Sequence, residues 1–330
     1  MSGALHSKGS HRKHPIVRKQ SMIKFLLVVL ALILLALLVP WLLPRPGMDG
    51  KIPDRPFPDS RFGDVDGVRL HWRQRQLDAP AGRPLVVLLH GFGGSTFSWR
   101  TTLDALEHKG LPAVAVDLPP FGYSERTGRG PAWHELVLGL ADRLAPSRRL
   151  VVVGHSMGAG VAAEAAAAAP DRVGRLVFVD GTPNLRTSGI PYGWALNIPS
   201  VRRAVDSWAA WKLVNEDHVG KLLASAFGRR PTEEELAGYF RPLTVPNTYP
   251  PLLDRMRNRE KGALAGWDSV PLSVLWGEQD TWVEIDRIRP WIESHPKLVA
   301  FDTFAEAAHN PMDTHPDRFN DWLLTQIEDR

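Results

Sequence analysis

The feature that most constrains this chain is the pentapeptide Gly154-His155-Ser156-Met157-Gly158 with its surroundings. It follows the apolar run 150–153 and precedes the alanine-rich stretch 159–169, which predicts a strand, a sharp turn and a helix. Glycine on both sides suits a strained backbone at which a side chain would collide with the neighbouring strand or helix. The turn is therefore expected to lift the Ser156 hydroxyl above the edge of a sheet.

From about residue 60, short apolar runs alternate with helical stretches, which is typical of a mostly parallel sheet wrapped by helices. Continuous apolar runs are expected where both faces of a strand are covered. Residues 65–76 have strand patterning with an Asp66-Gly67 turn, which predicts an opening hairpin. The predicted parallel strands are 85–89, 113–116, 150–153, 175–179, 272–276 and 298–301, and further helices are predicted at 99–109, 131–144 and 316–327.

The alternation breaks between residues 183 and 266. This stretch contains helical patches, three tryptophans and a cluster of prolines. We interpret this stretch as an inserted helical cap, flanked by core segments 61–182 and 267–330. Two roles stay open for Trp194, Trp208 and Trp211: burial in the core of the cap, or contact with a ligand.

Residues 25–43 are apolar and uncharged, with one proline near the end. Nineteen helical residues span about 28 Å, close to the hydrocarbon thickness of a bilayer. A basic arm, residues 1–24, precedes this stretch, and the proline-rich residues 44–60 follow it as a semi-rigid linker. We therefore predict a single-pass transmembrane signal-anchor. A cleaved signal peptide, a misread start codon and a buried helix are the alternatives.

Six basic residues precede the apolar stretch and few follow it directly, so the positive-inside rule predicts a cytoplasmic N-terminus. The remaining domain would then be extracytoplasmic, on the periplasmic side of a bacterial inner membrane. Seven of the forty basic residues lie in residues 1–48, which hold no acid, so thirty-three basic and thirty-six acidic residues remain. That balance argues against a nucleic-acid partner. With no cysteine, disulfides and thiol chemistry are excluded.

From residue 60 onward the chain resembles the α/β-hydrolase superfamily, whose motifs occur here in the expected order. The resemblance implies a mostly parallel eight-stranded sheet flanked by helices, with an inserted cap. It rests on the serine turn together with His90-Gly91-Phe92-Gly93-Gly94-Ser95, Asp117-Leu118-Pro119-Pro120-Phe121-Gly122-Tyr123-Ser124, Gly277-Glu278-Gln279-Asp280 and Ala308-His309-Asn310-Pro311. Pro120-Phe121 departs from the small or basic residues usual at that place.

A serine hydroxyl needs a base within hydrogen-bond reach to become a nucleophile, and histidine titrates near neutral pH. His309 and Asp280 each follow a predicted strand, at the sheet edge where Ser156 lies. The order Ser156, Asp280, His309 matches that of the superfamily. We therefore predict a triad in which Asp280 orients the His309 imidazole.

Other residues compete for these roles. His295 and His315 are competing bases, for which solvated or capping roles are favoured, and Asp180 and Glu278 are competing acids. His90 is expected to bond the backbone and shape its loop, and Asp117 is expected to be structural.

The oxyanion hole is predicted to consist of two backbone N–H groups, those of Phe92 and Met157. Glycines in the loop after the first buried strand, Gly91 and Gly93 among them, let it approach the substrate closely. No metal cluster or dinucleotide fingerprint is recognisable, so neither a metal nor another cofactor is expected. A serine at the turn also argues against haloalkane dehalogenase and epoxide hydrolase chemistry, in which similar folds use aspartate.

These residues predict a membrane-anchored serine hydrolase that cleaves a carboxylic ester, with a small hydrophobic substrate. The same triad also serves carbon–carbon bond hydrolases and cofactor-free haloperoxidase-like perhydrolases, which remain alternatives. A non-catalytic binding module that kept the fold is a more distant alternative, disfavoured because all three side chains are intact.

Overall fold

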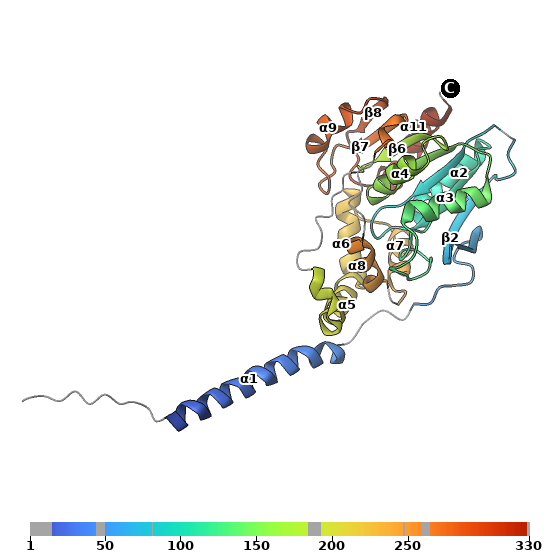
Figure 1. Ribbon diagram of the computed structural model, residues 1–330. Helices are drawn as coiled ribbons and strands as arrows, with labels where there is room; N and C mark the ends of the chain where they lie inside the picture. The colour runs from blue at the N-terminus through green and yellow to red at the C-terminus, as the bar shows by residue number, and fades with distance from the viewer. Residues whose placement is uncertain are drawn as a thin grey trace, which may run out of the picture. The chain divides into compact units, whose positions relative to one another are not determined.

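The computed structural model describes residues 15–43, 50–80, 82–183, 193–246, 248–258 and 265–328. Its centre is an eight-stranded sheet of order β1-β2-β4-β3-β5-β6-β7-β8, as the resemblance predicted (Figure 1). The strands are β1 (Ser60–Val65), β2 (Val68–Arg75), β3 (Leu85–Leu89), β4 (Ala113–Val116), β5 (Leu150–His155), β6 (Val173–Val179), β7 (Leu272–Gly277) and β8 (Leu298–Phe304).

The predicted hairpin opens the sheet. Asp66 and Gly67 join β1 to β2 with φ angles of 50° and 80°, the left-handed conformation that tight hairpin turns require. β2 pairs antiparallel with β1 and with β4, and the remaining pairs are parallel. β5 extends two residues beyond the predicted end, because Gly154 and His155 still pair with Phe178 and Val179 of β6.

Helices cover the sheet on both faces, which gives three layers (Figure 1). One core joins the sheet to α3 (Trp133–Leu144), α4 (Met157–Ala168) and α9 (Ile285–Glu293). The other joins the opposite face to α2 (Arg100–His108) and α11 (Pro316–Glu328). Five of the seven alanines of α4 are buried, so this helix packs closely against the neighbouring strands β5 and β6.

Between β6 and β7 lies a helical segment, called the inserted segment below. Its described elements are η2 (Gly193–Asn197), α5 (Pro199–Leu213), α6 (Glu216–Phe227), α7 (Glu233–Leu243), α8 (Tyr249–Asn258) and η3 (Trp267–Ser269). Local signals set the boundaries: the Asn215 side chain caps α6, Gly228 ends it at φ 66°, and Thr232 with Glu235 forms a capping box on α7.

Of the two roles left open for the three tryptophans of the inserted segment, burial in the core is wrong. Trp194, Trp208 and Trp211 are 67%, 61% and 60% exposed, and none of them lines the cavity described below. The packed side of α5 carries smaller side chains instead, since Ala209 and Ala210 are buried.

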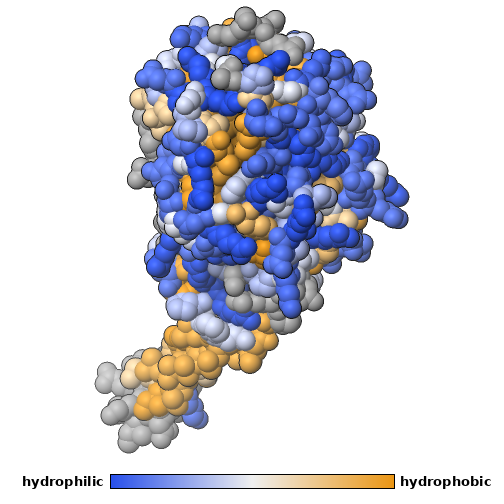
Figure 2. Space-filling view, turned by 90° about the vertical axis from the view of Figure 1, so that its right-hand side faces the viewer, coloured by the Kyte–Doolittle hydropathy of each residue, from blue (hydrophilic) through white to orange (hydrophobic). Residues whose placement is uncertain are grey.

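The chain divides into two compact units, one of which holds the N-terminal helix with residues 194–207. Helix α1 (Pro15–Leu42) contains an apolar stretch, Met22–Leu42, of mean hydropathy 3.1. By length and composition this stretch can cross a membrane, and Figure 2 shows its hydrophobic surface. Residues 1–14 of the predicted basic arm and 44–49 of the predicted linker lie outside the described part of the chain.

Candidate active site

Ser156 lies at the turn between β5 and α4, with φ 50° and ψ −114°. This backbone is rare for a residue with a side chain, and it persists because close packing on both sides enforces it. A Cβ on Gly154 would come within 2.4 Å of the Gly158 carbonyl oxygen. A Cβ on Gly158 would come equally close to the Leu89 carbonyl oxygen, so both positions require glycine.

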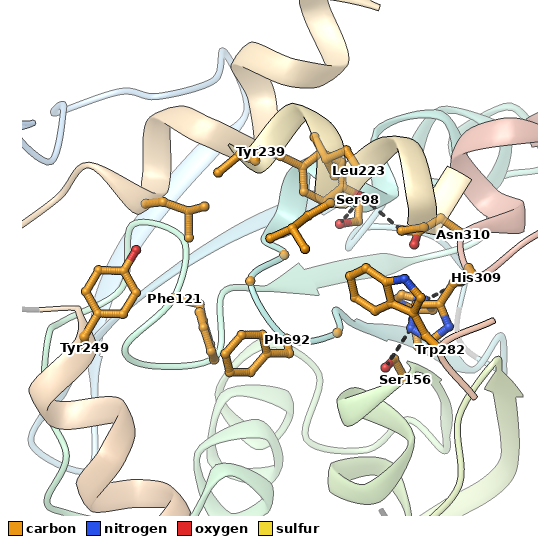
Figure 3. Close-up of a pocket in the computed structure, with 18 residues that line it drawn as sticks. Phe92, Ser98, Phe121, Ser156, Leu223, Tyr239, Tyr249, Trp282, His309 and Asn310 are labelled. Carbon is orange, nitrogen blue, oxygen red and sulfur yellow. Dashed lines mark hydrogen bonds between the residues drawn. The ribbon is translucent and has the colours of Figure 1, made fainter. Parts of the chain in front are cut away.

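The fold brings together Ser156, His309 and Asp280 from three separate loops at one edge of the sheet. His309 Nε2 lies 3.0 Å from Ser156 Oγ, and His309 Nδ1 lies 2.7 Å from Asp280 Oδ2 (Figure 3). The carboxylate can only accept, so the imidazole proton is on Nδ1 and Nε2 is free to accept from the hydroxyl. His309 and Asp280 are only 3% and 6% exposed.

Two backbone amides hold the Asp280 carboxylate in place. Its Oδ1 accepts from Trp282 N–H at 2.7 Å and from Val283 N–H at 3.0 Å, which leaves Oδ2 for the imidazole. A carboxylate fixed in this way cannot rotate away from its histidine without breaking two charge-assisted hydrogen bonds.

The structure uses the competing histidines and Glu278 elsewhere. His295 is buried rather than solvated, and its ring lies tilted against Trp267 with centroids 4.7 Å apart. It accepts the Lys297 N–H, which is a local turn role. His315 bonds the hydroxyl of its neighbour Thr314 at 2.9 Å. Glu278 accepts from the Thr303 hydroxyl.

Asp180 is the competitor that the fold does bring to the site. It ends β6 at φ 45°, is fully buried, and accepts the Gly277 N–H at 2.8 Å through Oδ1. Burial raises its pKa well above the usual value, and the neighbouring charge of Asp280 raises it further. Both effects favour the protonated form of Asp180, which lies beside Asp280 without taking its place on the imidazole.

One oxygen or nitrogen atom each of Asp180, Asp280 and His309 lies within 4.8 Å of the others, a spacing that could hold a metal ion. The 2.7 Å between Asp280 and His309 is a hydrogen-bond distance. Two ligands of one zinc ion, each about 2.0–2.2 Å from it, would lie more than about 3 Å apart. The distance between Asp280 and His309 therefore fits a hydrogen-bonded pair better than two ligands of one metal ion.

The predicted oxyanion donors lie on segments next to Ser156. Met157 is the first residue of α4, and the loop carrying Phe92 passes so close that a Cβ on Gly91 would lie 3.1 Å from Ser156 Cβ. Within the described residues, no hydrogen bond engages the amide of Phe92 or Met157. Both amides can thus donate to a substrate oxygen.

Buried polar residues support these loops in the expected way. His90 bonds the Gly91 carbonyl at 2.7 Å and accepts the Leu118 N–H at 3.0 Å, which shapes its loop. Asp117 accepts from two backbone amides and from His71 Nδ1. Burial alone would raise the Asp117 pKa, but the charge and hydrogen bond of His71 outweigh it and the pKa is lowered.

His155, the residue before Ser156, holds the backbone of His309. Its Nε2–H donates to the His309 carbonyl at 2.8 Å, and the two rings lie 4.9 Å apart. Burial, and next the neighbouring His309, lower the pKa of His155 well below its usual value. His155 is therefore a neutral imidazole that fixes the backbone of His309 without adding charge.

A cavity of about 330 Å³ opens above Ser156. Its size is that of pockets for small organic ligands. Figure 3 shows Ser156 and His309 at one end and Tyr249 at the other, with Phe92 and Phe121 between them. Its wall is mostly apolar, and the inserted segment contributes Val219, Leu222, Leu223, Ala226, Tyr239, Leu243 and Tyr249.

Sequence reasoning missed two residues that shape this cavity. The Trp282 ring stacks on His309, with centroids 5.2 Å apart and planes at 26°, and its Nε1–H donates to Ser225 of α6. The Tyr239 hydroxyl donates to the buried Asp313 at 2.5 Å, which ties α7 to the region after β8. Only its position two residues after Asp280 could have drawn attention to Trp282, and no signal marked Tyr239.

Comparison with known proteins identifies the class. The profile of the alpha/beta hydrolase family matches residues 86–322, so this chain belongs to that family and is a hydrolase. The uncharacterized hydrolase YugF of Bacillus subtilis is 29% identical over 238 residues, which cover 69% of this chain and 83% of YugF.

Two further matches are a curated relative and a solved structure. A 2-hydroxy-6-oxononadienedioate/2-hydroxy-6-oxononatrienedioate hydrolase of Paraburkholderia phymatum is 27% identical over 277 residues, covering 78% of this chain and 90% of that protein. Among solved structures, a membrane phospholipase A superimposes with a TM-score of 0.62 and 20% identity, covering 94% of this chain and all of that one. The structural likeness shows the shared fold.

Proposed function

We propose that this hydrolase is a membrane-anchored serine esterase that cleaves carboxylic esters through an acyl-enzyme. The observation that carries the proposal is the chain of two hydrogen bonds, 3.0 Å from Ser156 to His309 and 2.7 Å from His309 to Asp280. A hydroxyl in such a chain can lose its proton to the imidazole as it attacks.

In the proposed reaction, Ser156 Oγ attacks the ester carbonyl carbon while its proton passes to His309 Nε2. The tetrahedral intermediate then expels the alcohol, which takes that proton from His309. Water attacks the acyl-enzyme, gives a proton to His309, and the acid leaves as Ser156 regains its proton. Asp280 holds the imidazole in the required tautomer and stabilises its cation throughout.

We assign the oxyanion hole to the amides of Phe92 and Met157. Each donor of this kind contributes roughly 3–4 kcal/mol of transition-state stabilisation in serine hydrolases. Because backbone amides sit on fixed elements, they would need little reorganisation as charge develops on the substrate oxygen.

The cavity wall favours an ester with an apolar acyl or alcohol group. Leu222, Leu223 and Ala226 of α6 line it, and its lining residues include neither lysine nor arginine. The substrate named for the Paraburkholderia relative is a dicarboxylate, which cationic groups would be expected to hold. This argues for ester hydrolysis over carbon–carbon bond hydrolysis, the second candidate that this relative supports.

We further propose that Met22–Leu42 anchors the enzyme in a bilayer and that residues 183–266 form the cap over the site. The anchor is supported by a stretch of 21 residues with mean hydropathy 3.1. The basic residues before it support a cytoplasmic N-terminus and an extracytoplasmic catalytic domain.

A serine-directed fluorophosphonate probe tests the proposed chemistry. The full-length protein is expected to be labelled, and Ser156→Ala is expected to lose both labelling and turnover of p-nitrophenyl esters. Ser294→Ala, on an exposed serine outside the cavity, is the matched control and keeps both. Labelling that persists in Ser156→Ala would overturn the assignment. Turnover of a vinylogous diketone without turnover of esters would favour the second candidate.

A further inference from the structure

The inserted segment leaves four large apolar side chains in contact with solvent within eighteen residues. Trp194, Ile198, Trp208 and Trp211 are 67%, 37%, 61% and 60% exposed. Within α5, Trp208 and Trp211 are three residues apart and therefore share one side of the helix. The intervening Ala209 and Ala210 are buried, so the tryptophans form an outward apolar side on an otherwise packed helix.

The charges of α5 are also unevenly distributed. Its acidic residue, Asp206, is only 2% exposed, whereas Lys212 is half-buried. The Lys212 Nζ lies 5.0 Å from the centroid of the Trp211 ring. Tryptophan beside lysine is the composition of helices that lie in the headgroup layer of a membrane, where the indole is half apolar and the cation meets lipid phosphate. We call Trp208, Trp211 and Lys212 the α5 face.

Hydrogen bonds within the first compact unit connect the start of α5 to the end of α1. The Ser200 hydroxyl donates to the Leu37 carbonyl at 2.6 Å and accepts from Trp41 Nε1–H at 3.3 Å. Arg203 donates to the Leu43 carbonyl at 3.0 Å. These partners lie at the end of the apolar stretch, where a membrane-spanning helix leaves the hydrocarbon. The first turns of α5 would therefore lie at the membrane surface.

We propose that the α5 face binds the lipid headgroup layer of the bilayer that α1 spans, and that the enzyme draws its ester substrate from that bilayer. This inference rests on the proposed anchoring and ester hydrolysis. A lipid surface fits this combination of exposed indoles and positive charge.

The absence of cysteine from the sequence allows a direct depth measurement. Lys212→Cys, labelled with an environment-sensitive fluorophore, is reconstituted as the full chain in phosphatidylcholine–phosphatidylglycerol vesicles with lipids spin-labelled near the headgroup. We expect strong quenching at position 212 and little at Val299→Cys, an exposed apolar control on β8. Equal quenching at both positions would overturn the proposal. Shielding that depends on protein concentration in lipid-free detergent would assign the face to a second copy and also overturn it.

Activity gives an independent test. The double variant Trp208→Ser/Trp211→Ser is expected to lose about tenfold in turnover of an ester embedded in vesicles, equivalent to about 1.4 kcal/mol of interfacial binding. Turnover of a soluble short-chain p-nitrophenyl ester should change less than twofold, and Val299→Ser should change neither. An equal loss on both substrates, or none on either, contradicts the proposal.

Fluorophosphonate labelling separates the possible failures. If Ser156 is labelled in the double variant but vesicle turnover is unaffected, the membrane-binding inference fails and the proposed chemistry stands. If the unmodified chain is not labelled at all, the proposed chemistry itself fails. Labelling of the variants also reports that they are folded.

Discussion

The sheet and the inserted segment use apolar side chains in opposite ways. Every side chain of β3 is buried, whereas Trp208 and Trp211 of α5 are more than half exposed. The central strands are covered by helices on both faces, so they carry apolar side chains at every position. The helices of the inserted segment are bounded by local capping residues, and some of their apolar side chains stay exposed to solvent. We therefore expect the sheet edge to fix the proposed reacting groups and the inserted segment to select what reaches them.

The largest effect is expected where the sheet edge orients the base. Asp280→Asn removes the carboxylate that accepts the His309 Nδ1–H, and an amide can donate there instead and favour the wrong tautomer. We expect kcat for a p-nitrophenyl ester to fall by about 10³- to 10⁴-fold, as in other triads. The measurement is steady-state kinetics, with exposed Asp286→Asn as the control.

A loss of less than about tenfold would show that Asp280 is not the main orienting acid. In that case the double variant Asp180→Asn/Asp280→Asn would reveal whether Asp180 had taken over. A large drop in kcat that appears only in the double variant would show that either carboxyl group can orient the imidazole. The orienting acid would then not be fixed by the sheet edge.

A smaller effect is expected at Trp282, which joins the two regions. Trp282→Ala removes the ring stacked on His309 and opens the imidazole to water, so kcat/KM should fall about tenfold, or about 1.4 kcal/mol. Trp282→Phe keeps a stacked ring and should stay within about threefold of the parent. Kinetics on a soluble ester measure both.

Ser225→Ala separates the two roles of this tryptophan, because it removes only the hydrogen bond to α6. A loss smaller than that of Trp282→Ala is expected. If Ser225→Ala were as damaging as Trp282→Ala, the position of the inserted segment would control the base. The division between the two regions would then be wrong.

The smallest effect concerns stability and the buried Asp180, whose pKa is raised. An acid with a raised native pKa binds more protons folded than unfolded at pH values between its two pKa values, so stability falls as pH rises above about 3.8 through the native pKa. Asp180→Asn has no such proton to lose. Denaturant unfolding in detergent should therefore show the variant gaining stability relative to the parent between pH 5 and pH 8. A constant difference would mean that Asp180 is charged in the native state.

Most of the sheet could be predicted from the sequence, because strands buried on both faces have continuous apolar runs bounded by turn residues. The predicted ranges for β3 and β4 match the observed strands. The ends of β5 and β8 were predicted too short, since pairing continues through residues such as Gly154 and Asp302 that do not look like strand residues. Pattern reasoning has no access to pairing partners.

The candidate site could be predicted less completely. Ser156, His309 and Asp280 follow strands whose carboxyl ends meet at one edge, so their proximity follows from topology. The contacts of Trp282 and Tyr239 depend on how helices separated by long stretches of sequence pack over that edge, which no local pattern encodes. Burial of the three tryptophans in the core of the inserted segment was wrongly favoured for a related reason, because residue type alone does not show which side of a helix packs against its neighbours.

The most direct test of the central claim is to observe the acyl-enzyme. Full-length protein mixed briefly with a p-nitrophenyl ester, quenched in acid and analysed by intact and peptide mass spectrometry should carry one acyl group on Ser156. Ser156→Ala should carry none. An acyl group on another residue, or turnover by Ser156→Ala at the parental rate, would contradict the account.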